Sequence, residues 1–198
     1  MNARDLAGWA VAAATAWLAP VAQAADAANT TPQVTVINGC HLWPYAQCPG
    51  ADLRHANLKG KDLRGANFTG AQMARADLRF ANLAGATLDG ADLSGARGYA
   101  LNAPGASFKG AKLIGADFEQ ARMFRANFTE ADLTAASLEA AKMAFVWFIG
   151  ARLNNANLQE TKFNAANLQN AHLDGALLRY TIFPDAFMEG CAGCPKDW

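Results

Sequence analysis

Residue types that can perform chemistry are sparse in this sequence, and its four cysteines are the first candidates. Cys191 and Cys194 form a Cys-x-x-Cys motif near the C-terminus, and Cys40 and Cys48 lie eight residues apart near the N-terminus. Such a motif can be a redox centre, a metal site or a disulfide, but a thioredoxin-like redox centre needs a strand-to-helix setting, which this segment lacks. Pro195 stands where a c-type haem attachment needs a histidine, so haem attachment is excluded.

Other catalytic arrangements are not recognisable in the sequence. The three histidines form no Ser-His-Asp or Cys-His arrangement, and the glycines follow a regular spacing instead of forming a phosphate-binding loop. Seventeen Lys and Arg residues balance seventeen Asp and Glu residues, so the charge gives no reason to expect nucleic acid as a partner. We therefore predict a protein that is not an enzyme and holds no cofactor.

The elements that position these residues follow from an unusual period of five. In the stretch ADLRHANLKGKDLRGANF, the residues Leu53, Leu58, Leu63 and Phe68 are five apart. Five residues turn an α-helix by about 500°, so these side chains would not share one helix face. A plain strand repeats every two residues. The spacing instead indicates a short extended side followed by a corner, often at a glycine, with two side chains inward and three outward.

The five-residue frame runs from Ala51 to Gly190, which is 140 residues or 28 units. The recurring units ADLRG, ANLAG, ADLSG and ADFEQ resemble the A-(D/N)-L-x-G repeat of the pentapeptide-repeat family. The resemblance implies an all-β fold, a right-handed quadrilateral β-helix with four units per coil and about seven coils. Phe108, Phe128 and Phe148 recur every twenty residues, as four sides require. At about 4.8 Å per coil, the implied rod is about 34 Å long.

Two places depart from the repeat pattern. Within residues 96–105, Leu101 takes the usually small inner position and Ala103 the usually large one, an exchange that roughly conserves volume. The preceding central position is a glycine, and we expect a bulge or local loop at Gly98-Tyr99. Lys61 replaces an inner alanine close to the open first coil.

The first 24 residues have the composition of a targeting signal. They contain Arg4, an apolar Ala-rich run too short for a confident membrane span, and a small-x-small motif that ends at Ala24. We predict a signal peptide over residues 1–24, cut near Ala24. The mature chain would be periplasmic or secreted and would contain no membrane span.

Both ends of the repeat segment need covers, because exposed strand edges invite polymerisation. Residues 25–50 are expected to form a linker and a cap, in which PQVTVIN alternates like a strand and the first two cysteines close a loop. Residues 191–198 form a C-terminal tail. The outward residues Leu177, Ile182 and Phe187 are apolar, which suggests burial under this tail or in a dimer.

The implied rod places the two cysteine pairs at opposite ends. In a coil of twenty residues, His172 stacks beside Cys191 and Cys194, so these three side chains could ligate zinc or copper. No fourth ligand is evident, and cysteines of an exported chain are expected to be oxidised. Because a disulfide spans only about 6 Å between Cα atoms, we predict local Cys40–Cys48 and Cys191–Cys194 disulfides.

A candidate partner surface appears when residues twenty apart are placed in columns. One outward column reads Asp62, Asn82, Asn102, Arg122, Lys142, Lys162 and becomes basic halfway along. The predicted surface comprises Arg122, Phe124, Arg125, Lys142, Phe145, Trp147, Ile149 and Lys162. Exposed aromatic residues clustered with cations are typical of binding hot spots. The expected partner is an unidentified protein or an anionic polymer or headgroup, and packing inside the protein or in a homodimer is the alternative.

These features favour a non-catalytic exported scaffold that presents a β-helical rod surface to a macromolecular partner. One alternative is a periplasmic redox or metal-handling protein that uses the Cys-x-x-Cys motif. The resemblance adds another, because some quinolone-resistance relatives bind gyrase as DNA mimics. That role requires a strongly acidic rod in the cytoplasm, whereas this chain is neutral. The resemblance also implies a homodimer through the C-terminal end, which is common in relatives.

Overall fold

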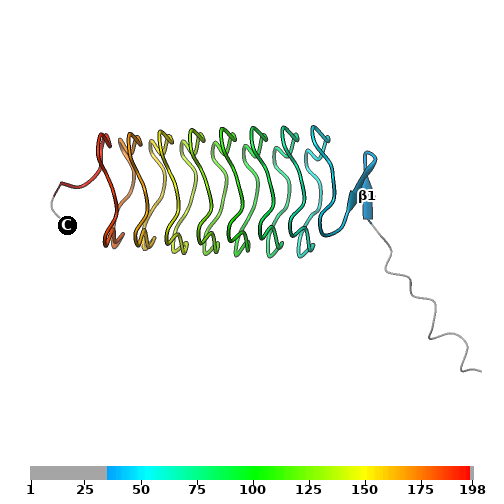
Figure 1. Ribbon diagram of the computed structural model, residues 1–198, viewed down its shortest axis with the longest axis horizontal. Helices are drawn as coiled ribbons and strands as arrows, with labels where there is room; N and C mark the ends of the chain where they lie inside the picture. The colour runs from blue at the N-terminus through cyan, green and yellow to red at the C-terminus, as the bar shows by residue number, and fades with distance from the viewer. Residues whose placement is uncertain (1–34, 197–198) are drawn as a thin grey trace, which may run out of the picture. The chain divides into compact units, whose positions relative to one another are not determined.

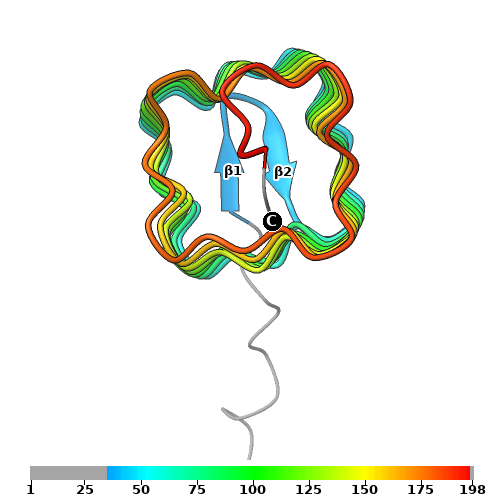
Figure 2. The ribbon, with the colours of Figure 1, turned by 90° about the vertical axis from the view of Figure 1, so that its left-hand side faces the viewer.

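The computed structural model describes residues 35–196, which form a right-handed, four-sided β-helix (Figures 1 and 2). Single parallel β-bridges join residues twenty apart, from Gln47↔Asn67 to His172↔Ala192. The coils stack in register into a rod, and Figure 2 shows their square outline viewed along it. The predicted signal peptide lies outside the described residues. Among residues 35–196, no helix is long and apolar enough to cross a membrane.

Each side of a coil is held by hydrogen bonds to both neighbouring coils. In the unit that begins at Ala111, the Lys112 N–H donates to the Ala91 carbonyl of the coil before, at 2.9 Å. The next N–H, of Leu113, donates to the Asp132 carbonyl of the coil after, at 2.7 Å. Because the backbone groups of one side point alternately up and down the rod, every inner coil is paired on both of its edges.

The fifth residue of each unit makes the corner in a left-handed conformation. Gly115 has a φ of 62°, which glycine adopts without steric cost. Non-glycine residues also occupy corners, for example Ala135 with a φ of 57° and Phe145 with a φ of 59°. The Phe145 N–H donates to the Asn164 carbonyl at 2.8 Å, so the ladder fixes the corner even where the side chain disfavours it.

Columns of inward side chains fill the rod. The first and third residues of each inner unit are buried, and the third position carries the large side chains. Phe108 and Phe128 stack with centroids 4.7 Å apart, and Phe128 and Phe148 stack at 5.0 Å. The twenty-residue recurrence of phenylalanine is therefore confirmed as a column of stacked rings, one ring per coil.

The bulge expected at Gly98-Tyr99 is wrong. Arg97 forms regular bridges to both neighbouring coils, and Gly98 is buried without any insertion. A Cβ added at Gly98 would overlap the Cδ1 and Cε1 atoms of Phe118, which stands in the same column one coil later. The Phe118 ring supplies the volume that Gly98 lacks, so the ladder needs no loop. The exchange of Leu101 and Ala103 also leaves the coil regular, because both side chains are fully buried at inward positions.

A β-hairpin closes the N-terminal end of the rod. Strand β1 (Thr35–Ile37) pairs antiparallel with β2 (Cys40–Leu42), and Figure 2 shows the hairpin across the coil outline. Lys61 Nζ donates to Thr35 Oγ1 at 2.6 Å, which explains the inner lysine: its ammonium reaches the cap and is not buried among alkyl groups. The strand expected in PQVTVIN is present over its described part.

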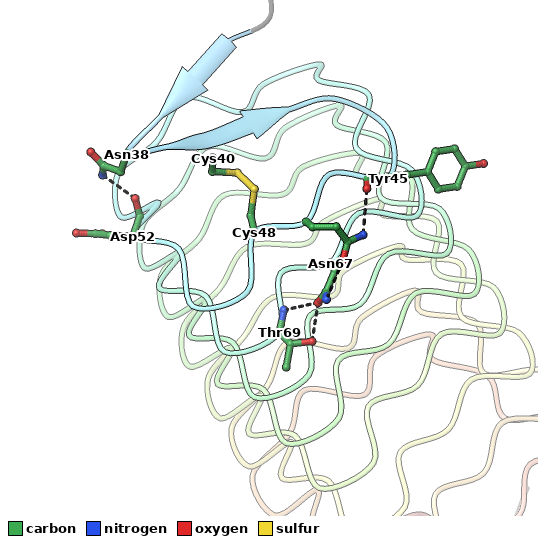
Figure 3. Close-up of a disulfide and its surroundings, with 8 residues drawn as sticks. Asn38, Cys40, Tyr45, Cys48, Asp52, Asn67 and Thr69 are labelled. Carbon is green, nitrogen blue, oxygen red and sulfur yellow. Dashed lines mark hydrogen bonds between the residues drawn. A yellow bond between two sulfur atoms is a disulfide. The ribbon is translucent and has the colours of Figure 1, made fainter.

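The Cys40–Cys48 disulfide ties this hairpin to the first coil, with the Cα atoms 5.5 Å apart. Cys48 occupies the large inward position of a unit at 46–50, so the ladder begins one unit before the expected Ala51. Around it, Asn38 Nδ2 donates to the Asp52 carbonyl at 2.7 Å (Figure 3). The hairpin is therefore joined to the rod by one disulfide and two side-chain hydrogen bonds.

The C-terminal tail turns inward across the last coil instead of covering its outer wall (Figure 2). Leu177, Ile182 and Phe187 are 53%, 41% and 48% exposed, so the expected burial under the tail is wrong. The Cys191–Cys194 disulfide is present, with the Cα atoms 5.7 Å apart. Among the described residues, the last coil has no following coil to pair with.

Candidate partner-binding surface

One side of the rod carries three cations in succession. The bridge ladder aligns Asp62, Asn82, Asn102, Arg122, Lys142, Lys162 and Ile182, which we call the basic face. Arg122, Lys142 and Lys162 are exposed and lie on three successive coils. The predicted column is thus a continuous surface, with its positive charge in the C-terminal half.

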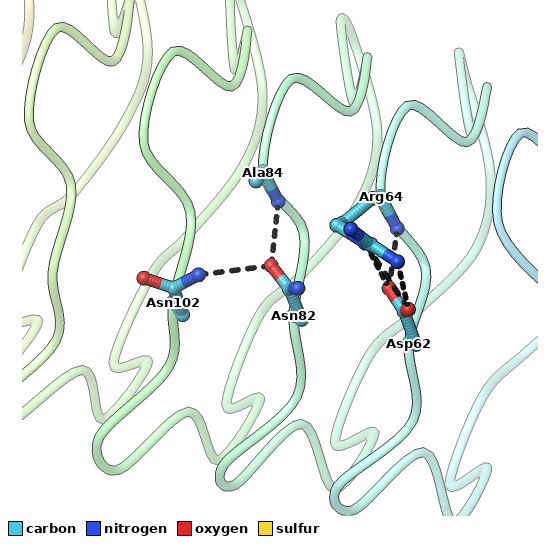
Figure 4. Close-up of polar contacts among 5 residues, drawn as sticks. All are labelled: Asp62, Arg64, Asn82, Ala84 and Asn102. Carbon is cyan, nitrogen blue, oxygen red and sulfur yellow. Dashed lines mark hydrogen bonds and ion pairs between the residues drawn. The ribbon is translucent and has the colours of Figure 1, made fainter.

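The N-terminal half of the basic face satisfies its own polar groups (Figure 4). Arg64 Nη2 contacts Asp62 Oδ2 at 2.7 Å. Asn102 Nδ2 donates to Asn82 Oδ1 at 2.9 Å, and the same oxygen accepts the Ala84 N–H at 3.2 Å. These groups already have partners, so this half offers little free hydrogen-bonding capacity.

The C-terminal half differs, because its cations have no anionic partner among residues 35–196. The ion pairs of the described chain all lie elsewhere and involve Asp52, Asp62, Asp77 and Asp132. On another side, charges alternate along the ladder as Asp92, Lys112, Asp132 and Arg152. Like charges on neighbouring ladder positions repel one another. The three adjacent cations are therefore a local electrostatic cost that a bound anion would offset.

Two carboxylates close to the basic face are hydrogen-bonded to residues of another side. Glu119 and Glu139 lie in the corner that precedes this face. Glu119 Oε1 accepts a hydrogen bond from Ser137 Oγ at 3.3 Å, and Glu139 Oε2 accepts one from Asn157 Nδ2 at 2.8 Å. Both acceptors thus serve residues of the neighbouring side. Glu160 is exposed in the same corner, next to Lys162, but within residues 35–196 it forms no ion pair with the cations of the basic face.

An aromatic cluster borders the opposite edge of the basic face. Phe124, Arg125 and Phe145, which we call the aromatic corner, occupy one corner on successive coils. The Phe124 and Phe145 rings meet edge to face at 5.3 Å, and Arg125 Cζ lies 5.0 Å and 5.9 Å from their centroids. Phe124 is 40% and Phe145 is 47% exposed, so both rings remain accessible to a partner.

The remaining two predicted residues lie beyond the aromatic corner. Trp147 is 53% exposed and belongs to the next side, in the ladder Asn127↔Trp147↔Asn167. Ile149 is only partly exposed and sits in the corner at the far edge of that side. The structure therefore brings six of the eight predicted residues together on the basic face and the aromatic corner, and it places Trp147 and Ile149 on the next side.

Sequence reasoning missed a hollow at the other edge of the basic face. The hollow has a volume of about 490 Å³ and is lined by Phe80, Ala100, Asn102, Gln120, Arg122, Ala140 and Lys142. Phe80 contacts Tyr99 edge to face at 5.7 Å, and the Tyr99 hydroxyl donates to Gln120 Oε1 at 3.0 Å. Phe80 in place of a corner glycine was the visible signal, but its neighbours emerge only from the coil register.

Elsewhere on the rod, Asp-x-Arg pairs set the electrostatics within single units. Arg54 donates a side-chain hydrogen bond to Asp52, which lowers the pKa of that carboxyl from 3.8 to about 2. Side-chain hydrogen bonds from Arg64 and Arg79 likewise lower the pKa values of Asp62 and Asp77. These aspartates are committed to local pairs, so they are poor candidates for acid–base chemistry.

The proposed metal ligands do not form a site. His172 does pair with Ala192 through the ladder, as the twenty-residue spacing predicts. However, both sulfur atoms of Cys191 and Cys194 are consumed in a disulfide, so no thiolate is available to a metal. No group of three or more metal-ligating His, Cys, Asp or Glu side chains occurs in the described part of the chain.

The fold is that of a β-solenoid. The sequence matches the family profile described as pentapeptide repeats, in eight copies, over residues 46–79, 76–99, 105–139, 126–155, 141–179 and 156–191. The chain therefore belongs to the pentapeptide-repeat family. Proteins of this family are generally structural or binding proteins rather than enzymes.

Several solved structures are similar to this chain. HetL, a pentapeptide repeat protein involved in heterocyst differentiation regulation from the cyanobacterium Nostoc sp., is 30% identical over 74% of this chain and 70% of that chain, with a TM-score of 0.30. QnrB1, a plasmid-mediated fluoroquinolone resistance protein, is 16% identical over 75% and 82%, with a TM-score of 0.43. A pentapeptide repeat protein from the Arabidopsis thaliana thylakoid lumen is 27% identical over 71% and 70%, with a TM-score of 0.22. No curated protein matches the sequence.

Proposed function

We propose that this protein is a non-catalytic exported scaffold that binds an anionic macromolecule through the basic face and the aromatic corner. The observation that carries the proposal is the run of three unpaired cations, Arg122, Lys142 and Lys162, beside exposed Phe124 and Phe145. Repulsion among the cations is relieved when an anion binds, and the aromatic rings supply apolar contact area.

Export is supported by two independent features. Residues 1–24 have the composition of a signal peptide. All cysteines of the chain are paired in disulfides at the two ends of the rod, an arrangement suited to an oxidising compartment such as the periplasm. A DNA-mimicking role has less support, because the chain is neutral and the run of like charges along the basic face is positive.

A second candidate role, self-association, follows from the C-terminal end. The last coil exposes Leu177, Ile182 and Phe187 on three successive sides, next to an edge that no further coil covers within residues 35–196. Apolar side chains around an open strand edge favour contact with another copy of the chain. Such a homodimer would cover Ile182 at the C-terminal end of the basic face but would leave Arg122 and Lys142, two or more coils away, free, so the two roles are compatible.

The binding role is tested by substituting two exposed aromatic residues. We expect Phe145→Ser with Trp147→Ser to abolish partner capture from periplasmic extract while circular dichroism stays unchanged. The matched control is Trp43→Ser with Tyr45→Ser, which removes two exposed aromatic residues from the N-terminal cap. If the Phe145/Trp147 variant captures the same partners at the same salt concentration, this surface is not the binding site.

A further inference from the structure

The hollow beside the basic face is elongated along the rod. One wall is a corner column of Phe80, Ala100, Gln120 and Ala140, and the other consists of Asn102, Arg122 and Lys142 from the basic face. Residues of one column lie one coil apart, so the stretch from Phe80 to Ala140 covers about 14 Å of the rod. The small Ala100 and Ala140 side chains give the hollow its depth, and the half-exposed Phe80 ring marks its N-terminal end.

The cations of the basic face are spaced regularly, and two of them, Arg122 and Lys142, line the hollow. Arg122, Lys142 and Lys162 follow one another at the coil spacing of about 4.8 Å, along the direction of the hollow. Such a row matches a linear polymer with one anionic group per short repeat unit, comparable in length to one sugar of an extended chain. A single headgroup would not present several anions in such a row, whereas a linear polymer repeats them along its length.

The walls exclude an acidic peptide that adds as a strand. The Arg122 N–H donates to the Leu101 carbonyl at 2.8 Å, and the Arg122 carbonyl accepts the Ala103 N–H at 2.8 Å. The backbone groups of the basic face are thus used within the ladder, so only side chains are available to a ligand. Strand addition takes its affinity from free main-chain groups, which this face does not offer.

The side chains of the hollow suit a carbohydrate. The Tyr99 hydroxyl donates to Gln120 Oε1 at 3.0 Å and holds this side chain in place, so its Nε2 can donate to a sugar hydroxyl. Asn102 Nδ2 already donates to Asn82, so this residue offers mainly its Oδ1 as an acceptor. Phe80 and Tyr99 provide an apolar surface at one end, against which the C–H face of a sugar ring can pack. Sugar-binding sites combine a few placed polar groups with aromatic surface, as ligand sites generally do.

We propose that this hollow binds a linear acidic polysaccharide, laid along the rod axis with its anionic groups on Arg122 and Lys142. The inference rests on the proposed function, because it assigns the anionic macromolecule to one chemical class. It also extends the binding surface to Phe80, Tyr99 and Gln120, on the edge of the basic face opposite the aromatic corner.

The test is isothermal titration of the purified protein with oligogalacturonate, a linear chain with one carboxylate per sugar. We expect one oligomer to bind per rod, binding to weaken as salt is raised, and fully methyl-esterified oligomer not to bind. Arg122→Gln with Lys142→Gln should weaken binding at least tenfold, and Phe80→Ser about threefold to tenfold. The control Lys112→Gln with Arg152→Gln removes two exposed cations from an alternating ladder and should change the affinity less than twofold.

Three other outcomes overturn the inference. If polyglutamate or phosphatidylglycerol vesicles bind as tightly as oligogalacturonate, the assignment to polysaccharide is wrong although the basic face still binds anions. If the control variant loses as much affinity as the Arg122/Lys142 variant, binding is not located at the hollow. If no acidic polymer binds while the Phe145/Trp147 variant still loses its partner, the inference fails and the proposed function stands.

Discussion

The exchange of volume between Gly98 and Phe118 can be tested by a double-mutant cycle. Both residues occupy the large inward position of the same column, one coil apart, where the neighbouring coils carry leucine. A Cβ at Gly98 would overlap the Phe118 ring. Gly98→Leu alone should therefore lower the free energy of unfolding by about 3 kcal/mol, at the upper end of overpacking costs, because the site is enclosed by coils on both sides.

Phe118→Leu alone leaves the space beside Gly98 partly empty. It should cost about 1.5 kcal/mol, less than complete removal of a buried phenylalanine. In the double variant the two leucines restore the pattern of the neighbouring coils, so the total cost should fall to within about 1 kcal/mol of the wild type. The expected coupling energy is therefore at least about 3.5 kcal/mol, slightly above the usual range for residues in contact.

The assay is equilibrium unfolding in urea followed by far-ultraviolet circular dichroism, with the slope compared among all variants. The control pair is Gly98→Leu with Phe148→Leu, because Phe148 stands in another column more than two coils away and its effect should be additive. If Gly98→Leu is neutral, or if its cost simply adds to that of Phe118→Leu, the Phe118 ring does not fill the space beside Gly98.

Two further predictions concern pH and the disulfides. Because the folded pKa values of Asp52, Asp62 and Asp77 are lowered, the stability they contribute is present above the unfolded value of 3.8 and is lost as pH falls toward 2. The midpoint of urea unfolding should therefore decline as the pH falls from about 4 toward 2. The variant with all three aspartates changed to asparagine should show a smaller decline. A midpoint that rises on acidification would contradict this prediction. Cys40→Ser with Cys48→Ser should cost about 2.5 kcal/mol and Cys191→Ser with Cys194→Ser about 1.5 kcal/mol, because the first pair closes the longer loop. Thermal unfolding measures both, and equal losses would argue against the loop-length reasoning.

The sequence alone determined the repeat and, through it, the register. A period of five with a large residue at Leu53, Leu58 and Leu63 excludes a helix and a plain strand, since neither places those side chains on one side. Once four units make a coil, residues twenty apart must be neighbours. The columns of the basic face and the stacked phenylalanines follow from that arithmetic, as does the location of the two disulfides at opposite ends.

The tertiary structure decided how irregular residues are accommodated, because their partners come from other coils. In the sequence, Gly98 breaks the pattern of large residues at the third position. In the structure, the ring of Phe118 fills the space beside Gly98. In the sequence, Lys61 is a charge at a position that is usually apolar. In the structure, Thr35 of β1 accepts a hydrogen bond from its ammonium group. In both cases the compensating group lies twenty or more residues away, so the local sequence carries no sign of it.

For the candidate site, too, the sequence predicts some features and only the structure shows the others. The cations Arg122, Lys142 and Lys162 and the rings of the aromatic corner could be assigned to one surface from the sequence, because the register alone places them. Their lack of anionic partners could not, since Glu119 and Glu139 lie close by and only the structure shows that they are hydrogen-bonded to Ser137 and Asn157. The hollow also depends on side-chain directions: Tyr99 fixes Gln120, and the small Ala100 and Ala140 leave space that the register does not reveal. A five-residue period fixes where each backbone position lies, whereas side-chain rotamers and contacts between coils decide which of those positions remain free to bind.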